Sequence, residues 1–350
     1  MHPKNLLFLT LVIAFNCSLT AQNRGVQMIT SGGSASFRGM SIPSDDVIWV
    51  SGSQGTVGKS VDGGKSFRFF VVPNFEKKDF RDIEAFDSST AIIMAIDNPA
   101  YILKTKDGGK TWKVVYQKTE NGMFLDAMDF RNKMEGICIG DPLVVGAAGR
   151  KFFFILRTVD GGETWLPTPM YNMPPANNEE AIFSASGSNV SFLDDDNYDY
   201  AFVTGGKISN LYLVGNLGKP NKVINLPLNQ GIESAGTFSL ATDGKKKFYC
   251  VGGDYKQPAM KYDNFYFSTD GGKKWGSPSF GPPYGYRSCI SIIEDKKLVT
   301  CGTNGVDFSK DGGRDWISIT KEGFNVSRVS PKSKTVFLAG DKGKIGRLIY

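Results

Sequence analysis

The chain has 350 residues, with 41 Lys and Arg against 35 Asp and Glu, and a formal net charge of +6. This length is ample for a large core, and the modest, scattered charge excludes the dense basic surface typical of nucleic-acid-binding proteins. The only histidine is His2. Histidine acid/base chemistry, Ser-His-Asp triads and histidine-based zinc, copper or haem sites are therefore excluded once the first residues are removed.

The N-terminus has the features of a secretory signal peptide. Lys4 precedes the apolar run 6–15, and a short polar stretch ends in Ala21-Gln22. An apolar run of about ten residues is too short to span a bilayer, and small residues favour signal cleavage. We therefore expect a signal peptide over residues 1–21, export to the periplasm or the extracellular space, and no membrane span.

Four cysteines follow the predicted signal peptide, namely Cys138, Cys250, Cys289 and Cys301. None forms a Cys-x-x-Cys pair, and all four lie in apolar, strand-like runs. Buried free thiols are the simpler interpretation. Because an oxidising compartment permits pairing, a cross-strand bridge between Cys289 and Cys301 is the alternative.

One pattern recurs five times: a hydroxyl residue, any residue, Asp-Gly-Gly, and an aromatic residue three positions later. Asp can accept backbone N–H bonds across a tight turn, and the two glycines supply positive φ. Each repeat therefore predicts a hairpin turn whose aromatic side chain packs in the seam between neighbouring sheets. We assign a structural role to the five aspartates, Asp62, Asp107, Asp160, Asp270 and Asp311.

These repeats match the Asp-box of sialidase-type, or BNR, repeats, which is typical of β-propeller blades. Neighbouring aspartates lie about 40 to 55 residues apart, except that Asp160 and Asp270 are separated by about twice that spacing. One blade has therefore lost its box. It is recognisable as residues 181–228, with predicted strands at 182–185, 200–204 and 210–214.

The other units open on an aromatic-led apolar strand, at Phe37, Phe80, Phe124, Phe238, Tyr286 and Phe324. The last unit stops after three predicted strands, and its missing outer strand can come from residues 26–30. Pairing the two termini in one blade removes exposed sheet edges. We predict an all-β, seven-bladed β-propeller as a single domain over residues 22–350. Six blades is the alternative if the terminal segments pair differently.

The innermost strand of each propeller blade lines the central channel, so residues at its start converge on one mouth. Several guanidinium groups held by a rigid ring would suit a carboxylate-bearing partner or an anionic sugar. A simpler interpretation is that the charges only neutralise one another around a water-filled channel. The candidate ligand-binding residues are Arg38, Arg81, Asp126, Asp141, Glu180, Glu233, Asp254, Tyr255, Tyr286 and Arg287.

We predict no cofactor and no metal. Segment 55–60 lacks the first glycine of a phosphate-binding loop and leads into a strand. The acidic run 194–199 lacks the alternating ligand spacing of a calcium loop. No dinucleotide-binding or haem-attachment motif is present.

Several segments resemble bacterial relatives of the plant and cyanobacterial photosystem II stability/assembly factor. The similarity covers essentially the whole chain after residue 21, and it implies a seven-bladed propeller. The photosynthetic members hold a partner polypeptide near an arginine-rich central patch, onto which Arg38, Arg81 and Arg287 would map. The label "oxidoreductase", often given to such relatives, has no support in the motifs. The segments are Phe37-Arg38-Gly39, Trp49-Val-Ser-Gly52, Phe183-Ser-Ala-Ser-Gly187, Ser234-Ala-Gly-Thr-Phe238, Gly253-Asp254-Tyr255 and Gly285-Tyr-Arg287-Ser288.

Two classes of function remain open. The first is a non-catalytic binding or assembly propeller, expected to be a monomer, that presents the arginines to a protein partner or an anionic or carbohydrate ligand. The second is a carbohydrate-active enzyme, a glycoside hydrolase or lyase, because sialidases also carry Asp-boxes. It would use the arginines, a tyrosine and a pair of carboxylates. The Arg-Ile-Pro opening of sialidases is here Arg38-Gly39-Met40, which argues against the enzyme.

Overall fold

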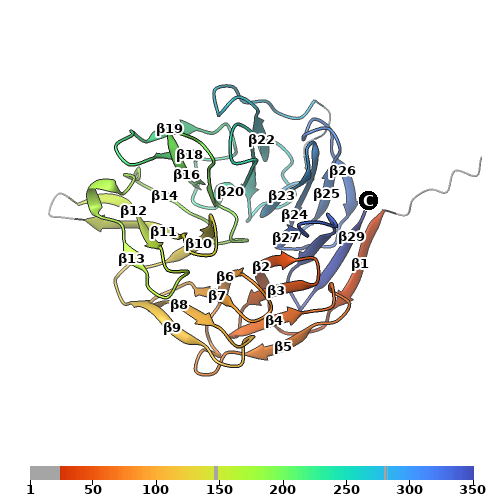
Figure 1. Ribbon diagram of the computed structural model, residues 1–350. Coiled ribbons are helices and arrows are strands. Elements are labelled where there is room, and N and C mark those ends of the chain that lie inside the picture. The colour runs from red at the N-terminus through yellow and green to blue at the C-terminus, as the bar shows by residue number, and fades with distance from the viewer. Residues whose placement is uncertain (1–23, 146–148, 280, 282) are drawn as a thin grey trace, which may run out of the picture.

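The computed structural model describes residues 24–145, 149–279, 281 and 283–350. Seven sheets form a closed ring around a central channel (Figure 1), with one short 3-10 turn, η1 (Met170–Asn172). The prediction of an all-β, seven-bladed propeller is confirmed, and the six-bladed alternative is wrong. Within the described ranges, no helix is long and apolar enough to cross a membrane. The predicted signal peptide lies outside them.

Each blade is an antiparallel sheet whose strands run from the channel outward to the rim of the ring. Blade 1 contains β2 (Phe37–Ser44), β3 (Val47–Gly52), β4 (Thr56–Ser60) and β5 (Arg68–Val71). Blade 2 contains β6 (Phe80–Ala85), β7 (Ala91–Ala95), β8 (Ala100–Thr105) and β9 (Lys113–Lys118). Blade 3 contains β10 (Leu125–Phe130), β11 (Gly136–Val145), β12 (Arg150–Thr158) and β13 (Leu166–Pro167). Blade 4 contains β15 (Val190–Phe192), β16 (Tyr198–Val203), β18 (Asn210–Gly215) and β19 (Lys222–Asn225).

The remaining blades follow the same plan. Blade 5 contains β20 (Ala235–Thr242), β21 (Phe248–Asp254) and β22 (Phe265–Ser268), and its inner edge pairs with the short strands β17 (Gly205–Gly206) and β14 (Glu180–Ala181). Blade 6 contains β23 (Cys289–Glu294), β24 (Lys297–Gly302), β25 (Gly305–Ser309) and β26 (Ile317–Thr320). Blade 7 contains β27 (Val326–Val329), β28 (Val336–Ala339), β29 (Ile345–Ile349) and β1 (Gly25–Thr30).

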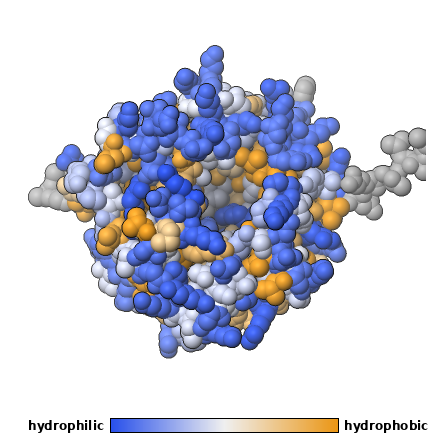
Figure 2. Space-filling view, viewed as in Figure 1, coloured by the Kyte–Doolittle hydropathy of each residue, from blue (hydrophilic) through white to orange (hydrophobic). Residues whose placement is uncertain are grey.

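Blade 7 closes the ring. Its outermost strand is β1, which pairs antiparallel with β29 from Gly25 opposite Ile349 to Thr30 opposite Ile345. The predicted pairing of the two terminal segments is therefore confirmed. Figure 2 shows one face of the resulting ring, hollowed at its centre and rimmed mainly by hydrophilic residues.

The first strand of blade 4 differs from the prediction. Residues 182–185 are not a strand, and the innermost strand of this blade is β15. Residues 182–189, which we call the crossing segment, instead lie in the central channel. Their side chains and carbonyls contact the inner parts of blades 1, 2, 5, 6 and 7. The prediction of a strand was wrong because this segment is as apolar as a buried strand, whereas its backbone forms hydrogen bonds with side chains.

Four of the five Asp-Gly-Gly repeats form the turn before the outermost strand of their blade, and the fourth repeat along the chain forms a turn directly after β22 of blade 5. In the first repeat the Ser60 hydroxyl donates to the Asp62 carboxylate over 2.7 Å, and the Ser66 N–H donates to it over 3.0 Å. The same pair of bonds recurs in the other four repeats. In the third repeat, hydrogen bonds from Thr164 are the main cause that lowers the pKa of Asp160 to about 2. The aspartates are thus turn formers.

The second glycine of the repeat is also required by the contact between blades. Gly109 has a φ of +88°, and a Cβ there would lie 2.4 Å from the ring of Phe70 in blade 1. The aromatic residue that ends a repeat packs in the same seam: Trp165 of blade 3 belongs to one hydrophobic cluster with Ile92 and Met94 of blade 2. The predicted packing of these aromatics between sheets is confirmed.

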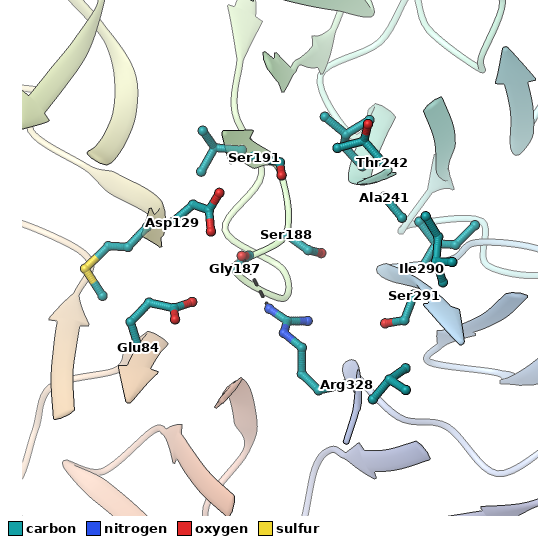
Figure 3. A pocket seen from close by; sticks show the side chains of 15 residues that line it. Glu84, Asp129, Gly187, Ser188, Ser191, Ala241, Thr242, Ile290, Ser291 and Arg328 are labelled. Atoms are coloured by element: carbon teal, nitrogen blue, oxygen red, sulfur yellow. Dashed lines mark hydrogen bonds between the residues drawn. The ribbon is translucent and has the colours of Figure 1, made fainter. Parts of the chain in front are cut away.

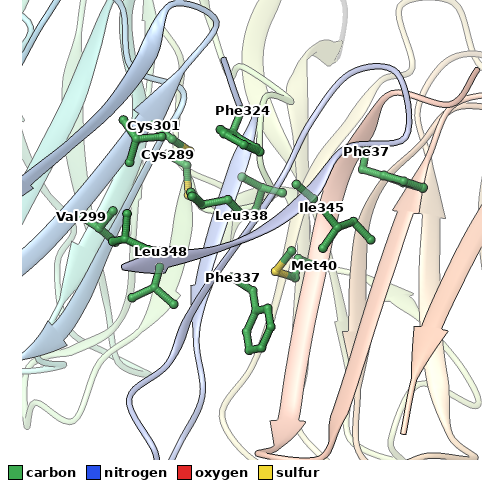
Figure 4. Packing of buried hydrophobic residues seen from close by; sticks show 14 of the residues in the cluster. Phe37, Met40, Cys289, Val299, Cys301, Phe324, Phe337, Leu338, Ile345 and Leu348 are labelled. Atoms are coloured by element: carbon green, nitrogen blue, oxygen red, sulfur yellow. The ribbon is translucent and has the colours of Figure 1, made fainter. Parts of the chain in front are cut away.

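The seam that joins blades 6, 7 and 1 is equally apolar (Figure 4). Phe37 from blade 1, Phe337 from blade 7 and Cys289 from blade 6 are all fully or almost fully buried in it. Cys289 lies directly opposite Cys301 in the pairing of β23 with β24. Both thiols are buried and free in the structure.

Candidate binding site at one mouth of the channel

Three predicted residues share one structural position. In blades 1, 2 and 3 the pairing register shifts by one residue at the start of the innermost strand. The extra residues are Arg38, Arg81 and Asp126. A β-bulge re-aims the side chain of its extra residue. The repeated bulge therefore turns all three side chains toward the same mouth of the channel.

The two arginines hold the crossing segment. Arg38 Nη1 donates to the carbonyl of Ala185 over 3.3 Å, and Arg81 Nη1 donates to the carbonyl of Ser184 over 3.2 Å. Arg81 Nε also donates to Asp79 over 2.8 Å. Both side chains remain partly exposed, and each guanidinium carries five N–H donors. Donors therefore remain for a ligand.

The closeness of the two guanidinium groups has an electrostatic consequence. The pKa of Arg38 is lowered mainly by burial, and secondly by the neighbouring positive charge of Arg81. Two cations held together in a partly buried position attract an anion.

An aromatic wall flanks the arginines. The Phe183 ring stacks on the Phe238 ring at 4.0 Å between centroids, and Phe238 meets Tyr286 edge-on at 4.8 Å. Tyr255 lies edge-on to both phenylalanines and is 47% exposed. The sequence analysis placed Phe238 at the start of a blade unit but not in the site. In the structure Phe238 occupies the bulge of β20 that corresponds to Arg38 in β2. A repeat alignment that placed this bulge would have found it.

Two carboxyl groups complete the mouth. Asp126 is fully buried, and within the described residues neither of its carboxyl oxygens has a hydrogen-bond partner. Burial and the nearby Asp141 raise the pKa of Asp126 well above its ordinary value. Asp141 accepts the Ile182 N–H over 2.9 Å, and burial raises its pKa to about 6. This pair therefore holds protons in mildly acidic solution.

The predicted position of Arg287 is wrong. Its side chain is fully buried, and its Nε donates over 2.8 Å to the buried carboxylate of Asp307 in β25. The Arg287 N–H donates to the carbonyl of Gly252, near the end of the second strand of blade 5. The Phe37 N–H likewise donates to the carbonyl of Gly340, just after the second strand of blade 7. Arg287 therefore corresponds to Phe37 and not to Arg38. This offset of one residue takes the guanidinium away from the mouth and pairs it with Asp307.

The other predicted carboxylates do not join the arginines. Glu180 is buried, and Asp254 is buried with one oxygen accepting the Lys256 N–H. Glu233 is exposed before β20. Glu180 is a structural carboxylate, because its oxygens are used by the side chains of Asn177, Thr204, Asn210 and Tyr212.

The opposite end of the channel holds a charged cluster that the sequence analysis missed. It contains Glu84 of β6, Asp129 of β10 and Arg328 of β27 (Figure 3). Each follows the aromatic residue that opens its unit by four or five positions, which is the signal that could have revealed it. Within the part of the chain that the structure describes, no group of three or more His, Cys, Asp or Glu side chains is arranged to hold a metal ion.

Of the comparisons with known proteins, the one with solved structures bears on the fold. A scan against protein-family models finds no match, and a search of curated proteins finds none either. Among solved structures, the chain is similar to "YCF48 bound to D1 peptide", with a TM-score of 0.64 and 17% identity over 95% of this chain and 98% of that one. YCF48 from Cyanidioschyzon merolae gives 0.60 and 14% over 93% and 98%. The chain has a YCF48-like propeller fold.

A glycoside hydrolase has the same architecture, with a similar TM-score and sequence identity. The GH74 enzyme of Niastella koreensis has a TM-score of 0.57 and 15% identity, over 92% of this chain and 53% of the enzyme. At such identities the likeness concerns the fold and leaves the activity open.

Proposed function

We propose that this propeller is a non-catalytic binding or assembly protein whose Arg38 and Arg81 receive a carboxylate of a partner polypeptide. The observation that carries the proposal is the pair of partly exposed guanidinium groups held side by side by the crossing segment. The neighbouring aromatic wall, with Tyr255 exposed, offers an apolar surface to the residues beside that carboxylate. The YCF48-like fold supports a polypeptide as the partner, since one such propeller has been solved with a D1 peptide.

The export of the chain belongs to the same proposal. The N-terminal pattern around Lys4 and Ala21 supports a periplasmic or extracellular binding platform that acts as a monomer. Detection of the mature protein in the periplasm or the culture medium, with its N-terminus at Gln22, would test this part directly.

Binding can be tested without knowing the natural partner. We would titrate a set of fluorescent peptides that end in a free carboxylate, each matched with its C-terminal amide. The carboxylate forms are expected to bind more tightly. Because a hydrogen bond to a charged group contributes about 1.5 to 3 kcal/mol, Arg38→Gln and Arg81→Gln should each weaken their binding roughly 10- to 100-fold.

The control is Arg68→Gln, which removes an exposed arginine of β5 on the outside of blade 1. This variant should bind as the unaltered protein does. Equal affinity of carboxylate and amide peptides, or equal binding by all three variants, would defeat the proposal.

A second candidate is a carbohydrate-active enzyme. The specific observation is the Asp126 and Asp141 pair, whose raised pKa values suit an acid that is protonated near pH 6. A screen of sialosides and acidic glycans, run with Asp141→Asn as the inactive control, tests this candidate. Absence of turnover by the unaltered protein retires it.

A further inference from the structure

A cavity of about 300 Å³ opens at the end of the channel opposite to Arg38 and Arg81. The crossing segment separates it from the first mouth, because Gly187 and Ser188 form part of its wall (Figure 3). The rest of the wall comes from β6, β10, β15, β20, β23 and β27. Its size lies at the lower end of the range of small-molecule sites.

The guanidinium of Arg328 in this cavity is already engaged. Its Nη1 donates to the carbonyl of Ser327 over 2.9 Å, and its Nη2 donates to the carbonyl of Ser186 over 3.0 Å. Nη1 also lies 3.5 Å from the sulfur of Cys289. Unlike Arg38 and Arg81, Arg328 therefore uses its terminal N–H donors within the chain, and few donors are left for an anion.

The carboxylates of the cavity have hydrogen-bond acceptors that the chain does not use. Glu84 has neither a hydrogen bond nor an ion pair among the described residues, and Figure 3 shows it pointing into the same space as Asp129. Each Asp129 oxygen accepts one backbone N–H, from Phe130 at 2.9 Å and Phe192 at 2.7 Å. A carboxylate oxygen accepts more than one hydrogen bond. Acceptors are therefore left over on both side chains.

The charges around Glu84 do not balance. Burial is the main cause that raises the pKa of Glu84. The negative charges of Asp82 and Asp129 raise it further, and the positive charge of Arg328 lowers it. The cavity thus contains two carboxylates facing a guanidinium that is committed elsewhere, with Asp82 beneath them. A ligand that brings a positive charge and N–H donors would satisfy these groups.

The remaining walls define the rest of such a ligand. Val190, Leu240 and Ile290 give an apolar side, and the hydroxyls of Ser191 and Ser291 give acceptors. An alkyl chain fits against the apolar side chains, and the serine hydroxyls can accept hydrogen bonds from a charged nitrogen.

We propose that this cavity binds a small organic cation, a primary ammonium or guanidinium group on a short alkyl chain, with Glu84 and Asp129 as its acceptors. The site is separate from the Arg38 and Arg81 mouth and does not depend on the function proposed for it. The bound cation would contact the crossing segment at Ser188, on the side opposite to the two arginines.

The test is calorimetric titration of the full mature chain with n-butylammonium and n-butylguanidinium, each compared with 1-butanol as a neutral probe of similar shape. Both cations are expected to bind, and 1-butanol is expected to bind at least tenfold more weakly. Glu84→Gln and Asp129→Asn should each weaken the binding of the cations at least tenfold.

Glu294→Gln is the matched control, because Glu294 is an exposed glutamate at the tip of blade 6 that pairs with Lys297. It should leave the titration unchanged. Three results would overturn the proposal: no heat of binding at millimolar cation, binding of 1-butanol as tight as that of the cations, or unchanged cation binding in Glu84→Gln. Thermal melting of every variant shows that folding is retained, and Asp129→Asn supplies an independent measurement if Glu84→Gln is poorly folded.

Discussion

The two ends of the central channel use the same segment and the same residue type in opposite ways. At one end Arg38 and Arg81 each give one hydrogen bond to the crossing segment and keep donors for a ligand. At the other end Arg328 commits both terminal nitrogens to the chain, and the side chain without a hydrogen bond among the described residues is the carboxylate of Glu84. The difference teaches that the unused N–H donors of an arginine, and not its position beside a channel, decide whether it can bind an anion.

The largest expected effect separates Arg287 from the mouth arginines. Arg287→Met leaves the buried carboxylate of Asp307 without its partner, and breaking a buried ion pair in this way costs about 3 to 5 kcal/mol. Arg38→Met removes a partly exposed side chain and should cost less than about 1 kcal/mol. Urea unfolding of the two variants measures both. Similar losses of stability would show that Arg38 contributes as much to the stability of the fold as Arg287 does.

The next effect concerns the segment that divides the two ends. Gly187 has a φ of +62°, and a Cβ there would lie 2.1 Å from Oδ1 of the buried Asp82. Gly187→Ala should lower the free energy of unfolding by about 1 to 3 kcal/mol, because the site has no room for a methyl group. It should also weaken ligand binding at both ends.

The control for this variant is Gly218→Ala, where φ is +81° but nothing lies within 4 Å of the new Cβ. Its backbone strain is similar and its steric clash is absent. If both variants lose the same stability, the crossing segment is not tightly packed against Asp82.

The affinity of the mouth for a carboxylate peptide should depend on pH. Asp141 has a pKa raised to about 6, so it is neutral below that pH and negative above it. The affinity of the mouth for a carboxylate peptide should therefore fall as the pH rises from 5 to 7, by roughly two- to fivefold for one partly screened charge. Asp141→Asn should remove this dependence. An affinity that rises with pH would place Asp141 away from the ligand.

The smallest effect is a gain in stability at the opposite end. Burial raises the pKa of Glu84 above its ordinary value of 4.5. The folded state then binds more protons than the unfolded state above pH 4.5, so stability falls as the pH rises. Glu84→Gln removes this penalty and should raise the melting temperature at pH 8 but not at pH 4. A lower melting temperature at pH 8 would mean that the carboxylate is favourably paired.

The fold was predictable because its signals repeat. The Asp-Gly-Gly turns mark the blades, and the chain ends supply the missing strand of blade 7. The site was only partly predictable. Arg38 and Arg81 reach the mouth through a β-bulge, whereas Arg287 lies one residue before the equivalent position, and no sequence pattern reveals that offset of one residue. Contacts across the channel, such as Arg328 with Ser186, join residues far apart in the chain and leave no local pattern.

The closure of the ring makes the two chain ends mechanically unequal. β1 forms the outer edge of blade 7 and is bonded on one side only, whereas β29 lies between β1 and β28. A pull on the N-terminus would load the hydrogen bonds of one edge strand, and a pull on the C-terminus would load a strand secured on both flanks. Attachment to a surface or a fusion partner through Tyr350 therefore leaves the ring better protected than attachment through the residues before β1.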